Sequence, residues 1–332
     1  MRKAILLTFL FFFLISTGVA GYGFLKYKHM TDQWYQPLQP EVQNKEGKDQ
    51  VKEETRQQNL PLVPQEKMVK PEEKPQMSPF TVMILGVDFR EGERKARSDT
   101  MMLAAVNPSL QKVTLLSIPR DTLVRIPGYG QDKFNHSMFY GGPTLVKQTI
   151  EEFFDMKVDR YVTLDFEGFI KLVDELGGVE VDVKRRMKYN DPMDGTAIDL
   201  RPGVQHLDGK QALDYARFRK SDIGSDASDF DRMARQQEVV KQLSEKASRV
   251  STVFRVFSLM NILGEHIKTD FSEEEVRKLA ILFKNFSSSK IQIIELKGTS
   301  QRLPKHGYNL WFHVVSDEEK KRIYNLIQET LQ

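Results

Sequence analysis

From residue 80 onward, apolar residues occur in short runs separated by polar turns. The first three runs are FTVMILGVD, TMMLAAV and KVTLLSIPRDT, at 80–88, 100–106 and 112–122, and polar residues end or directly follow each of them. Apolar runs of this length predict buried strands. Similar patterns predict further strands in RYVTLDF, VEVDV and KIQIIEL, at 160–166, 179–183 and 290–296.

The segments between these strands carry apolar residues at helical spacing. PTLVKQTIEEFFDM (143–156) predicts a helix with Pro143 in its first turn. FEGFIKLVDELGG (166–178) predicts a helix that Asp165 caps and that Gly177 and Gly178 end. Further helices are predicted near 208–217, 230–248, 250–263, 272–285 and 316–331.

Strands that alternate with helices indicate one fold class. They predict an α/β protein, a layered α/β/α domain with a central mixed sheet. The segment KYNDPMDGTAIDLRPG (188–203) is rich in turn residues and predicts a small hairpin within this domain.

The N-terminus has an uninterrupted run of 22 uncharged residues at 4–25, between Lys3 and Lys26. As a helix this run would measure about 33 Å, which is enough to span the core of a bilayer. A cleaved signal peptide is the alternative, because Gly18 and Ala20 place small residues at positions −3 and −1. We favour a retained membrane anchor, since the run is longer than the apolar region of a typical signal peptide.

Residues 31–78 are polar, contain prolines and have almost no core-forming side chains. Such a segment buries too little apolar surface to offset its ordering entropy, so it predicts a disordered tether. The predicted organisation is an N-terminal stub and anchor at 1–30, a tether at 31–78 and a folded domain at 79–332. Positive charges flank the apolar run on both sides, so charge alone leaves its orientation open.

Composition excludes several classes of protein. The chain has no cysteine, which excludes thiol nucleophiles, disulfides and cysteine-ligated zinc. A net charge of +3 over 332 residues is too small to indicate a nucleic-acid-binding protein. The six histidines form no H-E-x-x-H or H-x-x-H pattern, so no histidine zinc site is predicted.

Charged residues are concentrated in ALDYARFRKSDIGSDASDFDRMARQQ, at 212–237. Arg217 and Arg219 are two apart, so they point to the same side of an extended segment. Arg232, Arg235 and Gln236 share one face of a helix. A solvated charged surface would explain this pattern, and a phosphate-binding site is the alternative.

Polar residues at the ends of the predicted strands favour the phosphate-binding site. Asp88 and Arg90 follow the first strand, and Arg120 with Asp121 follows the third. Asp99 precedes the second strand and would reach the same edge if that strand is antiparallel. Ligands of layered α/β domains bind at the carboxyl ends of strands, so these residues predict a site for a phosphate-like group.

The chain resembles the LytR-CpsA-Psr family, phosphotransferases that attach polymers to the bacterial cell wall and include the wall teichoic acid ligases of Gram-positive bacteria. The resemblance covers roughly residues 80–240 and rests on motifs in the family's order: GVD, RSDT, SIPRD, KFNHS, YGG, DFEGFIKLVDELGGVEVDV, LDGKQALDYARFR and DFDRMARQQ. It implies a single-pass protein of the cell membrane with its N-terminus in the cytoplasm. The domain at 79–332 would then be catalytic and extracytoplasmic.

The resemblance also implies roles for individual residues. The family's pyrophosphate-binding arginines match Arg120, Arg217 and Arg219, and its metal-binding aspartates match Asp88 and Asp99, for Mg²⁺ or alternatively Mn²⁺. Further active-site positions, which with Arg120 form the expected catalytic set, match Asp229, Arg232 and Gln236.

The chemistry of these side chains agrees with those roles, because planar guanidinium groups bind phosphate oxygens bidentately. Arg232 and Arg90 are further candidates for the pyrophosphate, although Arg90, like Arg235, could instead pair with carboxylates. Asp121 is expected to be a partner of Arg120 rather than a base. Two aspartates suit Mg²⁺, which takes water and substrate oxygens as its other ligands.

The implied reaction moves an anionic glycopolymer, such as teichoic acid, from a polyprenyl-pyrophosphate carrier to the C6 hydroxyl of N-acetylmuramic acid in peptidoglycan. A lipid tail requires an apolar groove, for which FIKLV and VFRVFSLMNIL are candidate linings. Two alternatives remain open from the sequence. The protein could be a pyrophosphatase that cleaves the same lipid with water, or a non-catalytic protein that binds or regulates wall polymers.

Overall fold

The computed structural model describes residues 34–38, 76–88, 97–192, 195–249, 259, 264–305 and 307–332. The predicted anchor, most of the predicted tether and all but one residue of the helix predicted at 250–263 lie outside these ranges. Within them, no helix has both the length and the apolar character needed to cross a membrane.

A six-stranded sheet forms the centre of the domain, in the order β11-β6-β1-β2-β3-β12. β1 is parallel to β6 and β3 is parallel to β12, whereas β2 is antiparallel to both β1 and β3. The predicted mixed sheet is therefore confirmed. The strands are β1 (Phe80–Asp88), β2 (Arg97–Asn107), β3 (Lys112–Ser117), β6 (Arg160–Asp165), β11 (Ile267–Thr269) and β12 (Ile291–Glu295).

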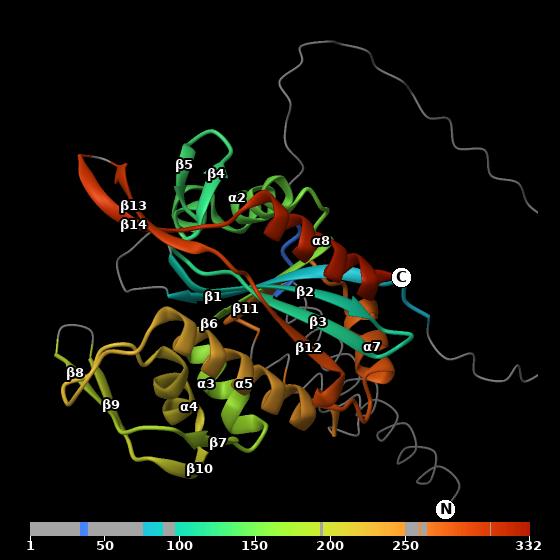
Figure 1. Cartoon of the computed structure of the whole chain (residues 1–332). Coiled ribbons are helices and arrows are strands. Elements are labelled where there is room, and N and C mark those ends of the chain that lie inside the picture. The colour runs from blue at the N-terminus through green and yellow to red at the C-terminus, as the bar shows by residue number, and fades with distance from the viewer. Residues whose placement is uncertain are drawn as a thin grey trace, which may run out of the picture.

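Helices cover both faces of this sheet (Figure 1). α2 (His136–Phe154) and α8 (Asp317–Leu331) lie on one face, and α3 (Phe166–Glu175) and α5 (Asp229–Ser248) lie on the other. α4 (Gly209–Arg217) packs against α3 and α5, and α7 (Glu273–Leu282) lies near the far end of the sheet. The layered α/β/α arrangement is as predicted.

The strands alternate between two apolar clusters, as the period of two in a strand requires. Met83 and Leu103 belong to the cluster that α2 and α8 cover, whereas Val82 and Met102 belong to the cluster on the opposite face. Burial of both faces explains why these strands are almost continuously apolar in the sequence.

Local signals placed the beginning of α3 correctly, whereas α2 begins at His136 and not at the predicted Pro143. The Asp165 carboxylate accepts a hydrogen bond from Gly168 N at 2.8 Å and caps α3. The backbone of α2 is non-helical at Gly141 and Gly142, so Pro143 begins its second part. Pro143 can occupy this first turn because the turn does not need its missing N–H.

Short two-stranded pairs surround the central sheet. The hairpin predicted within 188–203 is formed by β8 (Met187–Asp191) and β9 (Thr196–Leu200). The pairs β4–β5 and β13–β14 were not predicted, because neither has a sustained alternation of buried and exposed residues. The remaining strands are β4 (Leu123–Ile126), β5 (Gly130–Lys133), β7 (Val179–Val183), β10 (Gly203–Leu207), β13 (Thr299–Lys305) and β14 (Tyr308–Val314), and a short 3₁₀ turn spans Ser288–Lys290.

Residues 34–38 belong to the predicted tether but contact the domain. The Trp34 side chain is only 1% exposed, and Gln36 N donates to the Thr269 carbonyl at 2.7 Å. The Tyr161 hydroxyl donates to the Gln36 carbonyl at 2.5 Å. The prediction of a disordered tether therefore does not hold for these five residues, because one buried aromatic side chain and two hydrogen bonds attach them to the edge of the sheet.

Candidate active site

The site lies at the edge of the sheet where β1, β3 and β6 end. β2 begins at the same edge because it is antiparallel to β1, so Asp99 lies near Asp88, the last residue of β1. The register shifts here: Val87 pairs with Ser98 and Gly86 with Thr100, so Asp99 is an extra residue in a bulge. A bulge turns a side chain away from its regular direction, and the Asp99 carboxylate meets Arg120.

Arg120, which follows β3, is surrounded by carboxylates. Its Nη1 donates to Asp99 Oδ1 at 2.9 Å, and its Nε lies 3.6 Å from Asp229 Oδ2 and 3.7 Å from Asp121 Oδ2. Burial disfavours the charge of Arg120, but these carboxylates outweigh burial and raise its pKa above the ordinary value. Burial alone would likewise raise the pKa of Asp99, yet Arg120 lowers it below the usual value. Both groups are therefore charged at neutral pH.

Asp229, the first residue of α5, lies between three arginines. Besides Arg120, its carboxylate faces Arg219 and Arg232, with Oδ1 at 3.3 Å from Arg219 Nε and 3.5 Å from Arg232 Nη2. Ser228 caps the helix and thereby fixes where this first turn begins. Asp229 thus holds arginines from three segments at one point.

Arg232 is one helical turn beyond Asp229 and is 6% exposed. Burial lowers the pKa of Arg232, Asp229 raises it and Arg120 lowers it further, so the pKa lies below its ordinary value. The Nε atoms of Arg120 and Arg232 and the Oδ1 atom of Asp229 are buried and have no hydrogen-bond partner among the described residues. Buried cations with unused donors are favourable partners for an anion.

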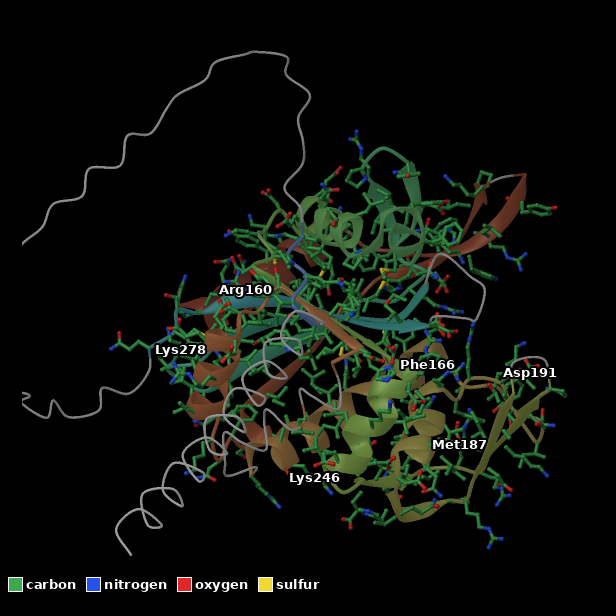
Figure 2. All side chains as sticks on the ribbon, turned by 180° about the vertical axis from the view of Figure 1, so that it is seen from behind. Arg160, Phe166, Met187, Asp191, Lys246 and Lys278 are labelled. Carbon is green, nitrogen blue, oxygen red and sulfur yellow. The ribbon has the colours of Figure 1, made fainter. Side chains whose placement is uncertain are left out.

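Arg217, at the end of α4, approaches from another direction. Its guanidinium lies 4.3 Å from the ring centroid of Phe166, the first residue of α3. This cation–π contact orients Arg217 through the face of its guanidinium, so the N–H groups at its rim can still bind a ligand. Figure 2 shows Phe166 at the end of α3 that meets the sheet.

Asp99, Phe166 and the four arginines described above line a cavity of about 280 Å³. Among the described residues in its wall, Asp99 is the one carboxylate. Gly86, Thr100, Gln236 and three residues of the β8–β9 hairpin complete much of the wall. The cationic side chains that line it are Arg120, Arg217, Arg219, Lys220 and Arg232.

The remaining candidates have different surroundings. Gln236 is 8% exposed, lines the cavity and donates to the Ala216 carbonyl at 3.4 Å. Arg235 is turned away from the cavity and donates to the Tyr215 and Phe218 carbonyls, so it supports the segment that carries Arg217. Asp121 accepts a hydrogen bond from Lys133 Nζ at 2.6 Å, a pairing that the sequence did not suggest. Arg90 lies outside the described residues.

Asp88 and Asp99 are the candidate ligands for a metal ion. They lie at the same sheet edge on paired strands, and Asp99 lines the cavity. No cluster of three or more potential ligand side chains occurs in the described part of the chain. A pair of carboxylates nevertheless fits Mg²⁺, which takes most of its remaining ligands from water and from substrate phosphates.

A second cavity, of about 400 Å³, adjoins the first between the sheet and helices α3 and α5. The two cavities share Gly86, Thr100, Phe166, Arg217 and Gln236 in their walls. Phe169 and Leu172 of the predicted lining FIKLV contribute to it, whereas VFRVFSLMNIL falls almost wholly outside the described residues. Its wall is mostly apolar and includes Ile84, Met102, Val162, Leu164, Leu176, Leu213, Val239, Val240 and Leu243.

Known proteins show the same sequence features and fold. The LytR_cpsA_psr family model matches residues 40–328. The polyisoprenyl-teichoic acid–peptidoglycan teichoic acid transferase TagU of Oceanobacillus iheyensis is 35% identical over 260 residues, which are 76% of each chain. The crystal structure of Bacillus subtilis TagV matches with a TM-score of 0.68 and 27% identity, over 77% of this chain and 98% of that one.

A further solved structure contains a ligand. It is described as the LytR-CPS2A-psr family protein YwtF (TagT) with bound octaprenyl pyrophosphate lipid. It matches this chain with a TM-score of 0.59 and 28% identity, over 80% of this chain and 94% of the other.

Proposed function

Because the chain belongs to the LytR-CpsA-Psr family, we propose that this transferase moves an anionic glycopolymer from a polyprenyl-pyrophosphate carrier to a hydroxyl group of peptidoglycan. The polymer is wall teichoic acid or one of similar charge. One observation supports this function best: a cavity lined by arginines adjoins an apolar cavity, with five residues shared between their walls. A prenyl pyrophosphate likewise consists of a charged group joined directly to an apolar chain.

The polar cavity suits the pyrophosphate. A pyrophosphate diester carries about two negative charges, and guanidinium groups bind its oxygens in pairs through their planar forks. Arg120, Arg217, Arg219 and Arg232 reach the cavity from separate segments. Asp99 and Asp229 offset part of the positive charge of these four arginines, and a bound pyrophosphate would neutralise the remainder and stabilise this arrangement.

The reaction is a phosphoryl transfer. The oxygen of the peptidoglycan hydroxyl, proposed to be the C6 hydroxyl of N-acetylmuramic acid, forms a bond to the phosphorus nearest the polymer. The bond between that phosphorus and the bridging oxygen breaks, and polyprenyl phosphate leaves with the electron pair. The hydroxyl proton passes to a base, for which Asp229 is the candidate. The product is a phosphodiester between polymer and peptidoglycan.

The arginines have two roles in this step. They neutralise the charge that accumulates on the transferring group, and they stabilise the leaving phosphate in a site that excludes much of the water. Mg²⁺, or Mn²⁺ in its place, would be held by Asp88 and Asp99 and would neutralise further phosphate charge. Gln236, which lines both cavities, is placed to bind a phosphate oxygen at their junction.

A transfer assay tests this function. The full-length chain is incubated with lipid-linked polymer, Mg²⁺ and peptidoglycan, and the products are separated. We expect polymer bound covalently to peptidoglycan. Free polymer phosphate as the main product would instead indicate a pyrophosphatase, and unconsumed lipid would indicate a protein that only binds the polymer.

The apolar cavity predicts that binding affinity depends on the length of the lipid tail. Burial of a methylene group contributes about 0.8 kcal/mol and an isoprene unit has five carbons, so each added unit should strengthen binding by about two to three orders of magnitude until the cavity is filled. Competition by prenyl pyrophosphates of increasing length against the lipid-linked polymer measures this. Equal inhibition by inorganic pyrophosphate and by a long prenyl pyrophosphate would contradict a lipid-binding role for this cavity.

The apolar run at 4–25 is proposed to anchor the domain on the outer side of the cell membrane, where the lipid-linked polymer and peptidoglycan meet. The run has the length of a membrane span, whereas the domain needs access to the wall. Protease added to intact protoplasts should therefore remove the domain. Protection from the protease, or a mature N-terminus at Gly21, would contradict this topology.

A further inference from the structure

The β13–β14 hairpin projects past the sheet edge that carries the site, on the side of α2 and β4–β5 (Figure 1). It is joined to the site at its base. His313 N donates to the Asp121 carbonyl at 2.9 Å, and Asp121 is the neighbour of Arg120. The His313 ring also meets the ring of Phe230, 5.8 Å away, and Phe230 directly follows Asp229.

One face of this hairpin continues from the site. Alternation along β14 places Asn309 and Trp311 on the same face as His313. Their cross-strand partners in β13 include Ser300, opposite His313, and Arg302, opposite Trp311.

Since the His313 ring reaches Phe230, this face is turned toward the beginning of α5. We call it the hairpin face. It comprises Ser300, Arg302, Pro304, Asn309 and Trp311, all of which are exposed.

The chemistry of the hairpin face suits a glycan that carries carboxylates. Trp311 is 54% exposed, and the Arg302 guanidinium lies 4.8 Å from its ring centroid. An exposed, rigid aromatic ring can stack on the apolar face of a sugar, while Ser300, Asn309 and Arg302 supply hydrogen bonds. Residues 296–316 contain three cationic residues other than histidine and no Asp or Glu. This segment therefore favours an anionic partner.

We propose that the hairpin face, with Phe230, binds the acceptor glycan strand of peptidoglycan and leads its hydroxyl to the site. The inference rests on the proposed function and names the surface for its acceptor. In-line transfer requires the hydroxyl to approach opposite the leaving group. In the proposed function, the prenyl chain of the leaving group lies in the apolar cavity, on the α3 and α5 side of the sheet. The hairpin lies on the other side of the sheet.

Two other occupants fit this face less well. A membrane-binding surface needs a broad apolar face, but the exposed hairpin face includes the polar or charged residues Ser300, Arg302 and Asn309. The donor polymer begins at the pyrophosphate, where the cavity wall comes from the β8–β9 hairpin through Tyr189, Thr196 and Ile198. Since the donor polymer lies at the β8–β9 hairpin, the acceptor is the substrate that we assign to the β13–β14 side.

The two tryptophans of the chain allow a binding test that needs no catalysis. Trp34 is 1% exposed and Trp311 is 54% exposed, so a soluble ligand at the hairpin face changes the emission of Trp311 alone. Soluble, undecorated peptidoglycan strands with their stem peptides are titrated into the full-length chain without lipid. We expect a saturable change in tryptophan emission, and its loss in Trp311→Phe. A wild-type emission that stays constant up to strand concentrations that saturate transfer would overturn the proposal.

Transfer kinetics provide the second arm of the test. Trp311→Ala should raise the KM for peptidoglycan strands about tenfold while kcat and the affinity for the lipid donor stay unchanged, and Trp311→Phe should recover part of the loss. Arg302→Gln should raise the same KM severalfold, and less so for strands without stem peptides. Val204→Ala is the matched control, since Val204 is 69% exposed on β10 and lies outside the hairpin face; this change should leave the KM unchanged.

The outcomes separate this inference from the proposed function. A wild-type chain that binds lipid but transfers no polymer contradicts the proposed function, whereas a saturable Trp311 signal still supports glycan binding. Normal transfer with an unchanged acceptor KM in Trp311→Ala overturns the inference. Loss of binding to anionic lipid vesicles by Trp311→Ala, with the acceptor KM unchanged, would assign the face to the membrane and overturn it as well.

Discussion

Replacement of any one of Arg120, Arg217 and Arg219 by lysine should slow polymer transfer on the order of 10²–10³-fold. Lysine keeps the positive charge but loses the planar fork that binds two phosphate oxygens at once. The loss should be largest at Arg120, because this residue also fixes Asp99 and Asp229 in place. The cost applies to the transition state, so kcat should fall at saturating lipid.

Arg125→Lys is the matched control for these variants, since the Arg125 side chain is 77% exposed on β4 and outside the cavity wall. It should transfer polymer at the wild-type rate. Thermal unfolding of each variant, with and without prenyl pyrophosphate, shows whether the fold is kept and the lipid still bound. Near-wild-type transfer by all three variants would refute the proposal that Arg120, Arg217 and Arg219 bind the pyrophosphate together.

Removal of Mg²⁺ by a chelator should abolish transfer, and Asp88→Asn should raise the Mg²⁺ concentration needed for half-maximal rate at least about tenfold. The reason is that a hard cation prefers charged oxygen ligands, and loss of one of two carboxylates weakens its site. Asp99→Asn should have a larger effect, because it also weakens the 2.9 Å hydrogen bond that orients Arg120.

A magnesium titration of the wild type and of both variants measures this effect. Mn²⁺ should restore activity after chelation. Thermal stabilisation by prenyl pyrophosphate, measured in the same variants, separates loss of the metal from loss of the lipid. Full transfer after exhaustive chelation, together with normal rates for both variants, would exclude the proposed metal site.

Much of the fold could be predicted because its determinants are local. Buried strands are continuously apolar, and the ends of α3 are encoded by Asp165 and by glycines with positive φ, such as Gly177. The β13–β14 hairpin lacks such a signal. Most of its residues are exposed and β13 contains Pro304, so its strands do not show a buried face in the sequence.

The burial of Trp34 could likewise not be predicted, because one aromatic residue in a polar segment makes no periodic pattern. Its contact with the domain depends on an exposed sheet edge at β11, which only the assembled fold provides.

The site could be predicted as a set of residues but not as a geometry. Strand ends and the arginine-rich segment identified Arg120, Arg217 and Arg219 as candidates, and the antiparallel course of β2 places Asp99 beside them. The position of Asp229 among three arginines depends on how α5 packs against the sheet, which sequence spacing does not determine. The junction of a polar and an apolar cavity has the same origin in tertiary packing.

The proposed reaction transfers the phosphate nearest the polymer from the lipid to peptidoglycan. Lipid-linked polymer that carries ³²P at that phosphate and ³H in its sugars makes this transfer visible. After incubation with the full-length chain and peptidoglycan, we expect both labels together in the insoluble wall fraction and, after muramidase digestion, on a muramic acid fragment. Both labels in soluble polymer phosphate, with none attached to peptidoglycan, would show that the protein hydrolyses the lipid and does not transfer the polymer.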